Sequence, residues 1–353
     1  MKVWFTLLCC WAWLCGCCDA QAPSPVKTSL ERPALATQHA ARSVLLGAAF
    51  AGSRIVVVGE RGIVLLSDDA GVNWRQAQVP VSVTLTAVRF ASAREGWAVG
   101  HAGTVLSTRD GGQTWQRQLD GQLAAQAILA NAKRRGDESG IKLAEQLVAD
   151  GADKPFLDLH FFDNQRGIVV GAYNLAFTTS DAGLSWQPIG HLLANPKASH
   201  LYAVRSRGTV VVIAGEQGML LRSNDSGATY QRLETPYRGS FFTVELPNDN
   251  AIVVAGMRGN ALRSDDAGQR WISMATAGST SITASALTLG GEIWLGNQAG
   301  TLWRMSERTL ETRQSAPGAA TTALLPLADG RLLTLSMRGL GVSPPQQSKA
   351  QPQ

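Results

Sequence analysis

A short motif occurs five times in this chain. Each copy has an Asp, a Gly two positions later and an aromatic residue five positions after the Asp. The copies are Asp69, Gly71 and Trp74; Asp110, Gly112 and Trp115; Asp181, Gly183 and Trp186; Asp225, Gly227 and Tyr230; and Asp266, Gly268 and Trp271. A fixed motif that returns after about 40 residues is typical of a β-propeller or a repeat array. This pattern constrains the fold far more than the function, because one scaffold can carry many functions.

A second repeated feature precedes each motif: two apolar runs joined by a Gly-x-x-Gly turn, which is the pattern of a β-hairpin. Seven such turns or close variants occur, beginning at Gly59, Gly100, Gly171, Gly215, Gly256, Gly296 and Ser336. One more apolar segment lies upstream of each hairpin. We assign this segment to strand A, the hairpin to strands B and C, and the segment after the motif to strand D. The sequence therefore predicts an all-β, seven-bladed β-propeller of four-stranded blades, forming a single domain over residues 23–342.

The repeated motif, called the Asp box below, has a structural interpretation. Its Asp can accept backbone N–H groups within the C–D turn, and its Gly can supply a positive φ angle. Its aromatic residue starts strand D and can pack between adjacent blades. We therefore expect all of these Asp, Gly and aromatic residues to be structural, and we do not expect a series of catalytic acids.

The sixth and seventh units lack the Asp box, and only strands A to C are visible in the seventh. Proteins usually cover an unpaired strand edge. The segment Lys27–Arg32 in the N-terminal lead-in is a candidate strand. We therefore expect this lead-in to supply the outer strand of the last blade.

An insert of residues 120–154, approximately, separates the second and third units and shows helical periodicity. Two apolar faces are expected, formed by Leu123, Ala127, Ile128 and Asn131 and by Ile141, Ala144, Leu147 and Val148. The insert thus predicts a helical hairpin. Because it connects strand D to the next strand A, it should emerge on the rim of the Gly-x-x-Gly turns. It could provide binding surface or only cap a gap between blades, and both interpretations stay open.

All five cysteines lie within the first 18 residues, in an apolar segment that follows Met1 and Lys2. This pattern and the Ala20-Gln21-Ala22 sequence predict a cleaved signal peptide over residues 1–22. An alternative is a lipobox at Leu14–Cys17, with lipid attached to Cys17. Either predicts an exported, periplasmic protein. Residues 343–353 are rich in Pro and Gln and are expected to form a disordered tail.

Several classes of function lack their signatures. The net charge of +5 is scattered, without a basic run carrying interleaved aromatics, so nucleic acid is not an expected partner. No histidine spacing suggests a metal site, and no nucleotide-binding loop or serine hydrolase motif occurs, so no cofactor is expected. Asp boxes also occur in sialidases, which makes a sialidase-like glycosidase an alternative. The arginine, acid and Tyr–Glu sets of those enzymes are not evident here.

One constellation of residues suggests binding. Arg61, Arg258 and Arg338 occupy the same point of three B–C turns, and His101 lies in a fourth. They are either solvated turn residues or parts of a surface for an anion or a protein partner. Arginine presents forked donors that suit carboxylates and phosphates. We take these four residues as candidate partner-binding residues.

The repeated unit, clearest in Glu95–Leu106 and Thr108–Trp115, resembles the photosystem II assembly and stability factor family of Asp-box, BNR-like propellers. The likeness covers roughly residues 43–340. It implies a non-enzymatic propeller on the lumenal or periplasmic side, which binds a protein partner through its arginines and helps to assemble or stabilise a membrane complex. We expect a monomer. Related sequences also occur in bacteria that do not photosynthesise, so a periplasmic accessory of an envelope transporter or other complex is an alternative.

Overall fold

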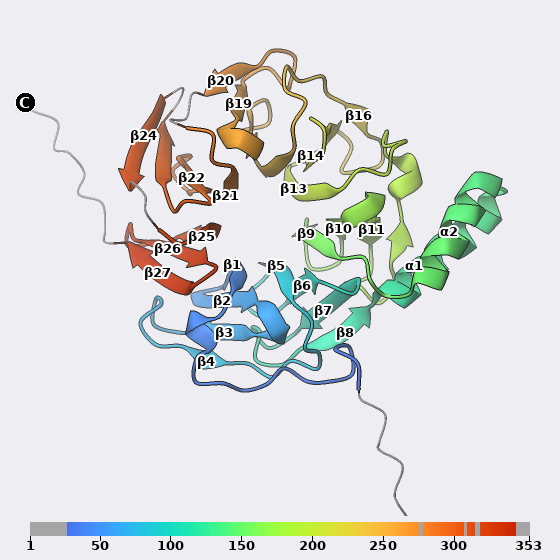
Figure 1. The fold of residues 1–353 in the computed structure, drawn as a ribbon, viewed down its shortest axis with the longest axis horizontal. Helices are drawn as coiled ribbons and strands as arrows, with labels where there is room; N and C mark the ends of the chain where they lie inside the picture. The colour runs from blue at the N-terminus through green and yellow to red at the C-terminus, as the bar shows by residue number, and fades with distance from the viewer. Residues whose placement is uncertain (1–26, 275–277, 307–308, 315–317, 344–353) are drawn as a thin grey trace, which may run out of the picture.

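The computed structural model describes residues 27–274, 278–306, 309–314 and 318–343. Figure 1 shows seven antiparallel sheets arranged as a ring around a central axis, so the predicted seven-bladed propeller is confirmed. Strand A of each blade is innermost and contacts strand A of the next blade. The ring closes where strand A of blade 7 contacts strand A of blade 1.

Each type of strand recurs from blade to blade. The A strands are β1 (Leu45–Ala51), β5 (Leu85–Phe90), β9 (Phe156–Phe161), β13 (Leu201–Arg207), β17 (Phe241–Glu245), β21 (Ile282–Leu287) and β25 (Thr321–Pro326). The B strands are β2 (Arg54–Gly59), β6 (Gly96–Gly100), β10 (Gly167–Gly171), β14 (Val210–Gly215), β18 (Ile252–Gly256), β22 (Ile293–Asn297) and β26 (Leu332–Ser336). The C strands are β3 (Val64–Ser67), β7 (Thr104–Thr108), β11 (Ala176–Thr179), β15 (Leu220–Ser223), β19 (Ala261–Ser264), β23 (Leu302–Ser306) and β27 (Gly339–Ser343). The D strands are β4 (Arg75–Gln76), β8 (Gln116–Leu119), β12 (Gln187–Pro188), β16 (Gln231–Arg232), β20 (Ile272–Met274) and β24 (Thr309–Gln314).

Most of the core lies between adjacent blades. The B strands are apolar at nearly every position, because each blade is covered by a neighbour on both faces. The aromatic residue of each Asp box packs between its own blade and the preceding one. Trp115 of blade 2, for example, is buried with Val56 and Leu66 of blade 1. Trp74 of blade 1 packs against a cluster that includes Leu333 of blade 7 and so contributes to ring closure.

The Asp-box carboxylates close the C–D turns. Asp110 Oδ1 accepts the backbone N–H of Gln113 at 2.8 Å and that of Thr114 at 3.0 Å. The Thr108 hydroxyl donates to the same carboxylate oxygen and accepts the N–H of Gly112, whose φ is +87°. The other four boxes repeat this carboxylate arrangement, at Asp69, Asp181, Asp225 and Asp266.

The N-terminal lead-in follows a path that differs from the prediction. Lys27–Arg32 forms no strand, and blade 7 has three strands among the described residues. The lead-in instead bonds to the linker between blades 1 and 2, where the Ala34 N–H donates to the Val79 carbonyl and the Ser82 N–H to the Ser29 carbonyl. The expectation that it supplies the outer strand of the last blade was wrong.

Two causes favour the observed path. Glu31 accepts both the N–H and the hydroxyl of Thr28, which closes a turn where a strand was expected. Leu30 and Ala34 also pack against the apolar cluster between blades 1 and 2. Near blade 7, a 3-10 helix, η1 (Ala40–Arg42), contacts β27 and covers part of this blade.

The predicted helical hairpin between blades 2 and 3 is confirmed as α1 (Gly121–Arg135) and α2 (Glu138–Asp150) (Figure 1). The Asp120 side chain caps α1, and Gly136 ends it in the left-handed conformation. Ala144 of α2 is fully buried as its periodicity predicted, and Ile128 of α1 packs on the core below. Leu123 is 49% exposed, because α1 turns its alanine-rich side toward the molecule.

Candidate functional site

The seven B–C turns share one rim of the ring, which we call the B–C rim; the C–D turns lie on the opposite box rim. Three of the turns form short 3-10 helices, η2 (Glu60–Gly62), η3 (Ala172–Asn174) and η5 (Met257–Gly259). The helical hairpin starts on the B–C rim, since the Gly121 N–H donates to the carbonyl of Ala102 in the blade 2 turn at 2.7 Å.

The structure places Arg61 and Arg258 at equivalent points of the turns in blades 1 and 5. Both have left-handed backbones, with φ of 54° and 56°, and both are exposed. Arg338 lies in the blade 7 turn and is exposed too, with its N–H held by the Ser336 hydroxyl. The three arginines thus lie on one rim, on blades 5, 7 and 1, which together with blade 6 form one continuous stretch of the ring.

His101 is exposed on the same rim, in the turn of blade 2. The arginines occupy the third position of the four-residue turn, whereas His101 occupies the second. Ala102 has the third position in this blade, with φ of 55°. In blades 3 and 4 the third position is occupied by Tyr173 and Gln217, also with positive φ. Cationic side chains at this position are therefore limited to one part of the rim.

The described residues contain no acidic partner within ion-pair distance of Arg61, Arg258 or Arg338. Several other arginines do have such partners: Arg54 contacts Asp68 at 2.5 Å, and Arg166 contacts Asp163 at 2.8 Å. Because these three guanidinium groups stay charged at physiological pH and have forked donors, they can bind carboxylates of another molecule.

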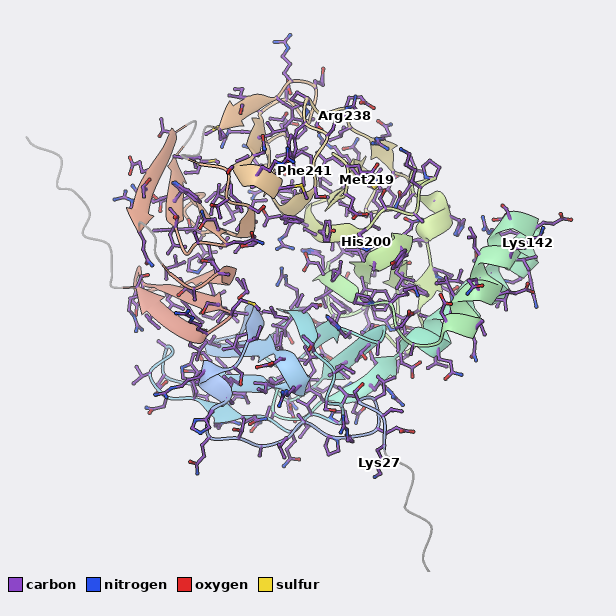
Figure 2. All side chains as sticks on the ribbon, viewed as in Figure 1. Lys27, Lys142, His200, Met219, Arg238 and Phe241 are labelled. Carbon is purple, nitrogen blue, oxygen red and sulfur yellow. The ribbon has the colours of Figure 1, made fainter. Side chains whose placement is uncertain are left out.

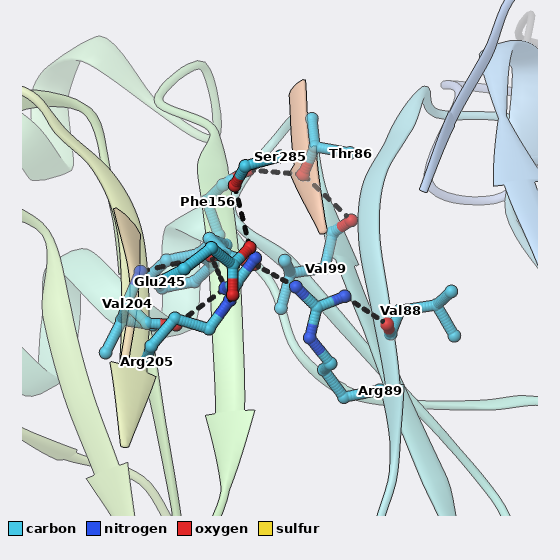
Figure 3. Close-up of polar contacts among 10 residues, drawn as sticks. Thr86, Val88, Arg89, Val99, Phe156, Val204, Arg205, Glu245 and Ser285 are labelled. Carbon is cyan, nitrogen blue, oxygen red and sulfur yellow. Dashed lines mark hydrogen bonds and ion pairs between the residues drawn. The ribbon is translucent and has the colours of Figure 1, made fainter. Parts of the chain in front are cut away.

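A buried polar network, absent from the sequence prediction, links the inner strands of blades 2 to 6 (Figure 3). Arg205 Nη1 lies 2.6 Å from Asp158 Oδ2, and Arg89 Nη2 lies 3.4 Å from Asp158 Oδ1. Glu245 accepts the Ser285 hydroxyl at 2.7 Å. Burial alone would raise the pKa of Asp158, but the Arg205 and Arg89 charges outweigh it and hold this pKa below its usual value. The network joins neighbouring blades.

A cavity of about 1300 Å³ opens on the box rim between blades 6, 7 and 1. Its walls include Phe50, Leu287 and Leu325, with Arg313 and Glu311 at one side. This hollow also had no sequence signal, because it arises where three blades meet. Among the described residues, no group of three or more His, Cys, Asp or Glu side chains is placed to hold a metal ion, and no helix is long and apolar enough to cross a membrane.

Comparison with known sequences assigns this chain to a family. The family model described as "Photosynthesis system II assembly factor YCF48" matches residues 72–153 and 142–293, which together are more than half of the chain. "Photosystem II assembly protein Ycf48" of Synechococcus sp. (strain JA-2-3B'a(2-13)) is 30% identical over 169 residues, which are 39% of this chain and 49% of the relative. "Photosystem II assembly lipoprotein Ycf48" of Synechococcus sp. (strain CC9902) is 29% identical over 93 residues, 26% of each chain. The chain thus matches about half the length of these curated relatives, or less.

Solved structures agree in fold. "YCF48 bound to D1 peptide" superposes with a TM-score of 0.64 at 17% identity, covering 90% of this chain and 100% of that chain. "YCF48 from Cyanidioschyzon merolae" has a TM-score of 0.62 at 15% identity, covering 86% and 95%. At these identities the superpositions show the propeller alone, whereas the family model carries the assignment. The chain belongs to the Ycf48 family of photosystem II assembly factors.

Proposed function

We propose that this protein is a non-enzymatic, monomeric assembly factor whose B–C rim binds an acidic segment of a membrane-complex subunit. The observation that carries the proposal is the set of three exposed, unpaired arginines on one rim of a Ycf48-family propeller. His101 extends the same surface onto blade 2. Desolvating a guanidinium without a partner is costly, so these groups favour a ligand that supplies carboxylates.

The named relatives support the kind of partner. One is named as a photosystem II assembly protein and one as a photosystem II assembly lipoprotein, and one superposed structure is described as bound to a D1 peptide. We infer that this chain binds a segment of a protein subunit, and that this subunit belongs to a membrane complex of the photosystem II type. An envelope complex of another kind is the alternative outcome of the capture experiment below.

The proposal includes export. The signal sequence over residues 1–22 and the lipobox ending at Cys17 lie outside the described residues, and one relative is named as a lipoprotein. We expect the mature chain to begin after Ala22, or at a lipid-modified Cys17, on the periplasmic side. Mass spectrometry of the mature N-terminus distinguishes the two forms, and an intact Met1 contradicts both.

The test is capture of the partner from detergent-solubilised membranes. The triple variant Arg61→Ala, Arg258→Ala, Arg338→Ala should capture at least tenfold less partner at low salt, and the difference should shrink as salt rises. The matched control removes the same charge from the box rim by Arg94→Ala, Arg109→Ala, Arg270→Ala, and should capture normally. Capture at the wild-type level by the first variant would contradict the proposal.

A further inference from the structure

Aromatic side chains gather on the B–C rim of blades 3, 4 and 5. This set, the aromatic arc, consists of Tyr173, His200, Tyr202, Tyr237 and Phe242. The ring centroids of Tyr173 and His200 are 4.6 Å apart, those of His200 and Tyr202 are 6.1 Å apart, and those of Tyr202 and Phe242 are 5.1 Å apart. Figure 2 shows His200 at the inner edge of the ring. On the B–C rim, the arc therefore includes a residue at the inner edge of the ring.

Tyr202 and Phe242 are the second residues of inner strands β13 and β17. In blades 2, 6 and 7 the same position holds threonines, and each threonine donates its hydroxyl to a carbonyl of the next inner strand. These are Thr86 to Phe156, Thr283 to Thr321, and Thr322 to Leu45. Blades 4 and 5 replace that bond between strands with two half-buried aromatic rings that meet edge to face. The second position of the inner strand thus joins neighbouring inner strands in blades 2, 6 and 7, whereas it presents aromatic surface in blades 4 and 5.

The polar ends of the arc are held in place. The Tyr202 hydroxyl lies 3.4 Å from Glu216 Oε1, and Glu216 Oε2 accepts the N–H of His200 at 2.8 Å. The Tyr237 hydroxyl donates to the carbonyl of Met257 at 2.8 Å, directly before Arg258. The arc also adjoins the first of these arginines within blade 5, because Phe241, the residue before Phe242, pairs with Gly256, two residues before Arg258.

This arrangement combines Tyr and Arg, two of the three residue types, with Trp, that are enriched among the residues that dominate binding energy at protein interfaces. An acidic ligand satisfies Arg258, Arg338 and Arg61, but it leaves Tyr202 and Phe242 uncovered. A ligand that carries both carboxylates and an apolar side chain covers the arginines and the aromatic rings together.

We propose that the B–C rim recognises an extended partner segment in two parts, with carboxylates on the arginines and an aromatic or branched aliphatic anchor side chain seated against Tyr202 and Phe242. This inference rests on the proposed function and specifies the chemistry of its ligand. Because Phe242 and Arg258 lie next to paired residues of the same blade, Phe241 and Gly256, the anchor and the first carboxylate lie close together in the partner sequence.

The experiment is selection of binders from a random twelve-residue peptide display library, which needs no knowledge of the natural partner. Wild-type protein should select peptides with two or more acidic residues and one apolar anchor at a fixed spacing. The double variant Tyr202→Thr, Phe242→Thr should keep the acidic preference and lose the anchor. Threonine is the residue of blades 2, 6 and 7 at this position, so the variant should retain the fold, which its melting temperature checks.

The affinity of one selected peptide, labelled and followed by fluorescence anisotropy, gives the magnitude. The double variant should bind it at least tenfold more weakly, while Leu184→Ser, an exposed change on the box rim, should leave binding unchanged. Acidic peptides without a preferred anchor, or an anchor retained by the double variant, would overturn the inference and leave the proposed function standing. Selection of peptides without acidic residues would instead contradict the proposed function.

Discussion

At the scale of single residues, one carboxylate makes most of the bonds that close each Asp-box turn. Asp110→Ala removes the acceptor of the Gln113 and Thr114 N–H groups. We expect a loss of about 1–3 kcal/mol of unfolding free energy, measured by chemical denaturation, with partner capture unchanged. Asp249→Ala, an exposed residue outside the boxes, is the control and should cost about 0.5 kcal/mol or less. Unchanged stability together with lost capture would show that the boxes bind the partner.

His160 in the inner strand β9 should make stability depend on pH. Burial, with the Arg205 and Arg89 charges, lowers its pKa from 6.5 to about 4, despite the opposing charge of Asp158. The unfolded chain therefore binds a proton at higher pH than the folded chain, and stability falls as pH decreases from about 6.5 toward 4.

The matching variant is His160→Gln, which keeps a polar group near the Ser206 hydroxyl, 2.7 Å from His160 Nε2 in the wild type. It should remove about 1–3 kcal/mol of the pH-dependent change in unfolding free energy between pH 6.5 and 4. Denaturation series at several pH values measure this. Equal slopes for the two proteins in that range would show that His160 protonates freely in the folded state.

The residues that could be predicted from the sequence are those that repeat. The Asp boxes and the turn arginines recur at fixed spacing, so their places followed from the repeat. Arg89, Asp158 and Arg205 did interrupt apolar inner segments, but each belongs to a different blade. Whether these three side chains meet depends on how the inner strands of neighbouring blades pack. The spacing of residues within one repeat unit does not reveal this packing.

At the scale of elements, the helical hairpin has one side on the core and one side in solvent. Ile128 packs on the cluster that contains Phe156, whereas Leu143 is 69% exposed. Ile128→Ala should lower the unfolding free energy by about 1–2 kcal/mol, less than for a fully buried site. Leu143→Ala should leave the unfolding free energy nearly unchanged. Thermal melts of both variants measure the two effects. Equal costs would show that the hairpin does not cover the gap between blades 2 and 3.

The regular strands could be predicted and the lead-in could not, for a physical reason. Each inner strand carries its own apolar pattern, and the repeat aligns seven of them, so their number and their order along the chain could be predicted. Lys27–Arg32 has no such pattern. Its path depends on the Thr28–Glu31 turn and on the contact of Leu30 with a distant cluster, and neither is visible as periodicity.

At the scale of the whole molecule, the ring presents two different rims. The B–C rim gathers unpaired arginines, the aromatic arc and the base of the hairpin, while the box rim carries the large cavity between blades 6, 7 and 1. Blade 6 reaches both rims, with Gln298 exposed in its B–C turn and Leu289 exposed at the cavity. The central claim is that the partner docks on the B–C rim.

The most direct test places a photo-crosslinking residue at Gln298 in one variant and at Leu289 in another, and irradiates each with detergent-solubilised membranes. The same blade carries both probes, each at an exposed position, and melting temperatures check that the two variants are equally stable. We expect a crosslink to the captured membrane subunit from position 298 and none from position 289. A crosslink from position 289 alone would place the partner on the box rim and contradict the central claim.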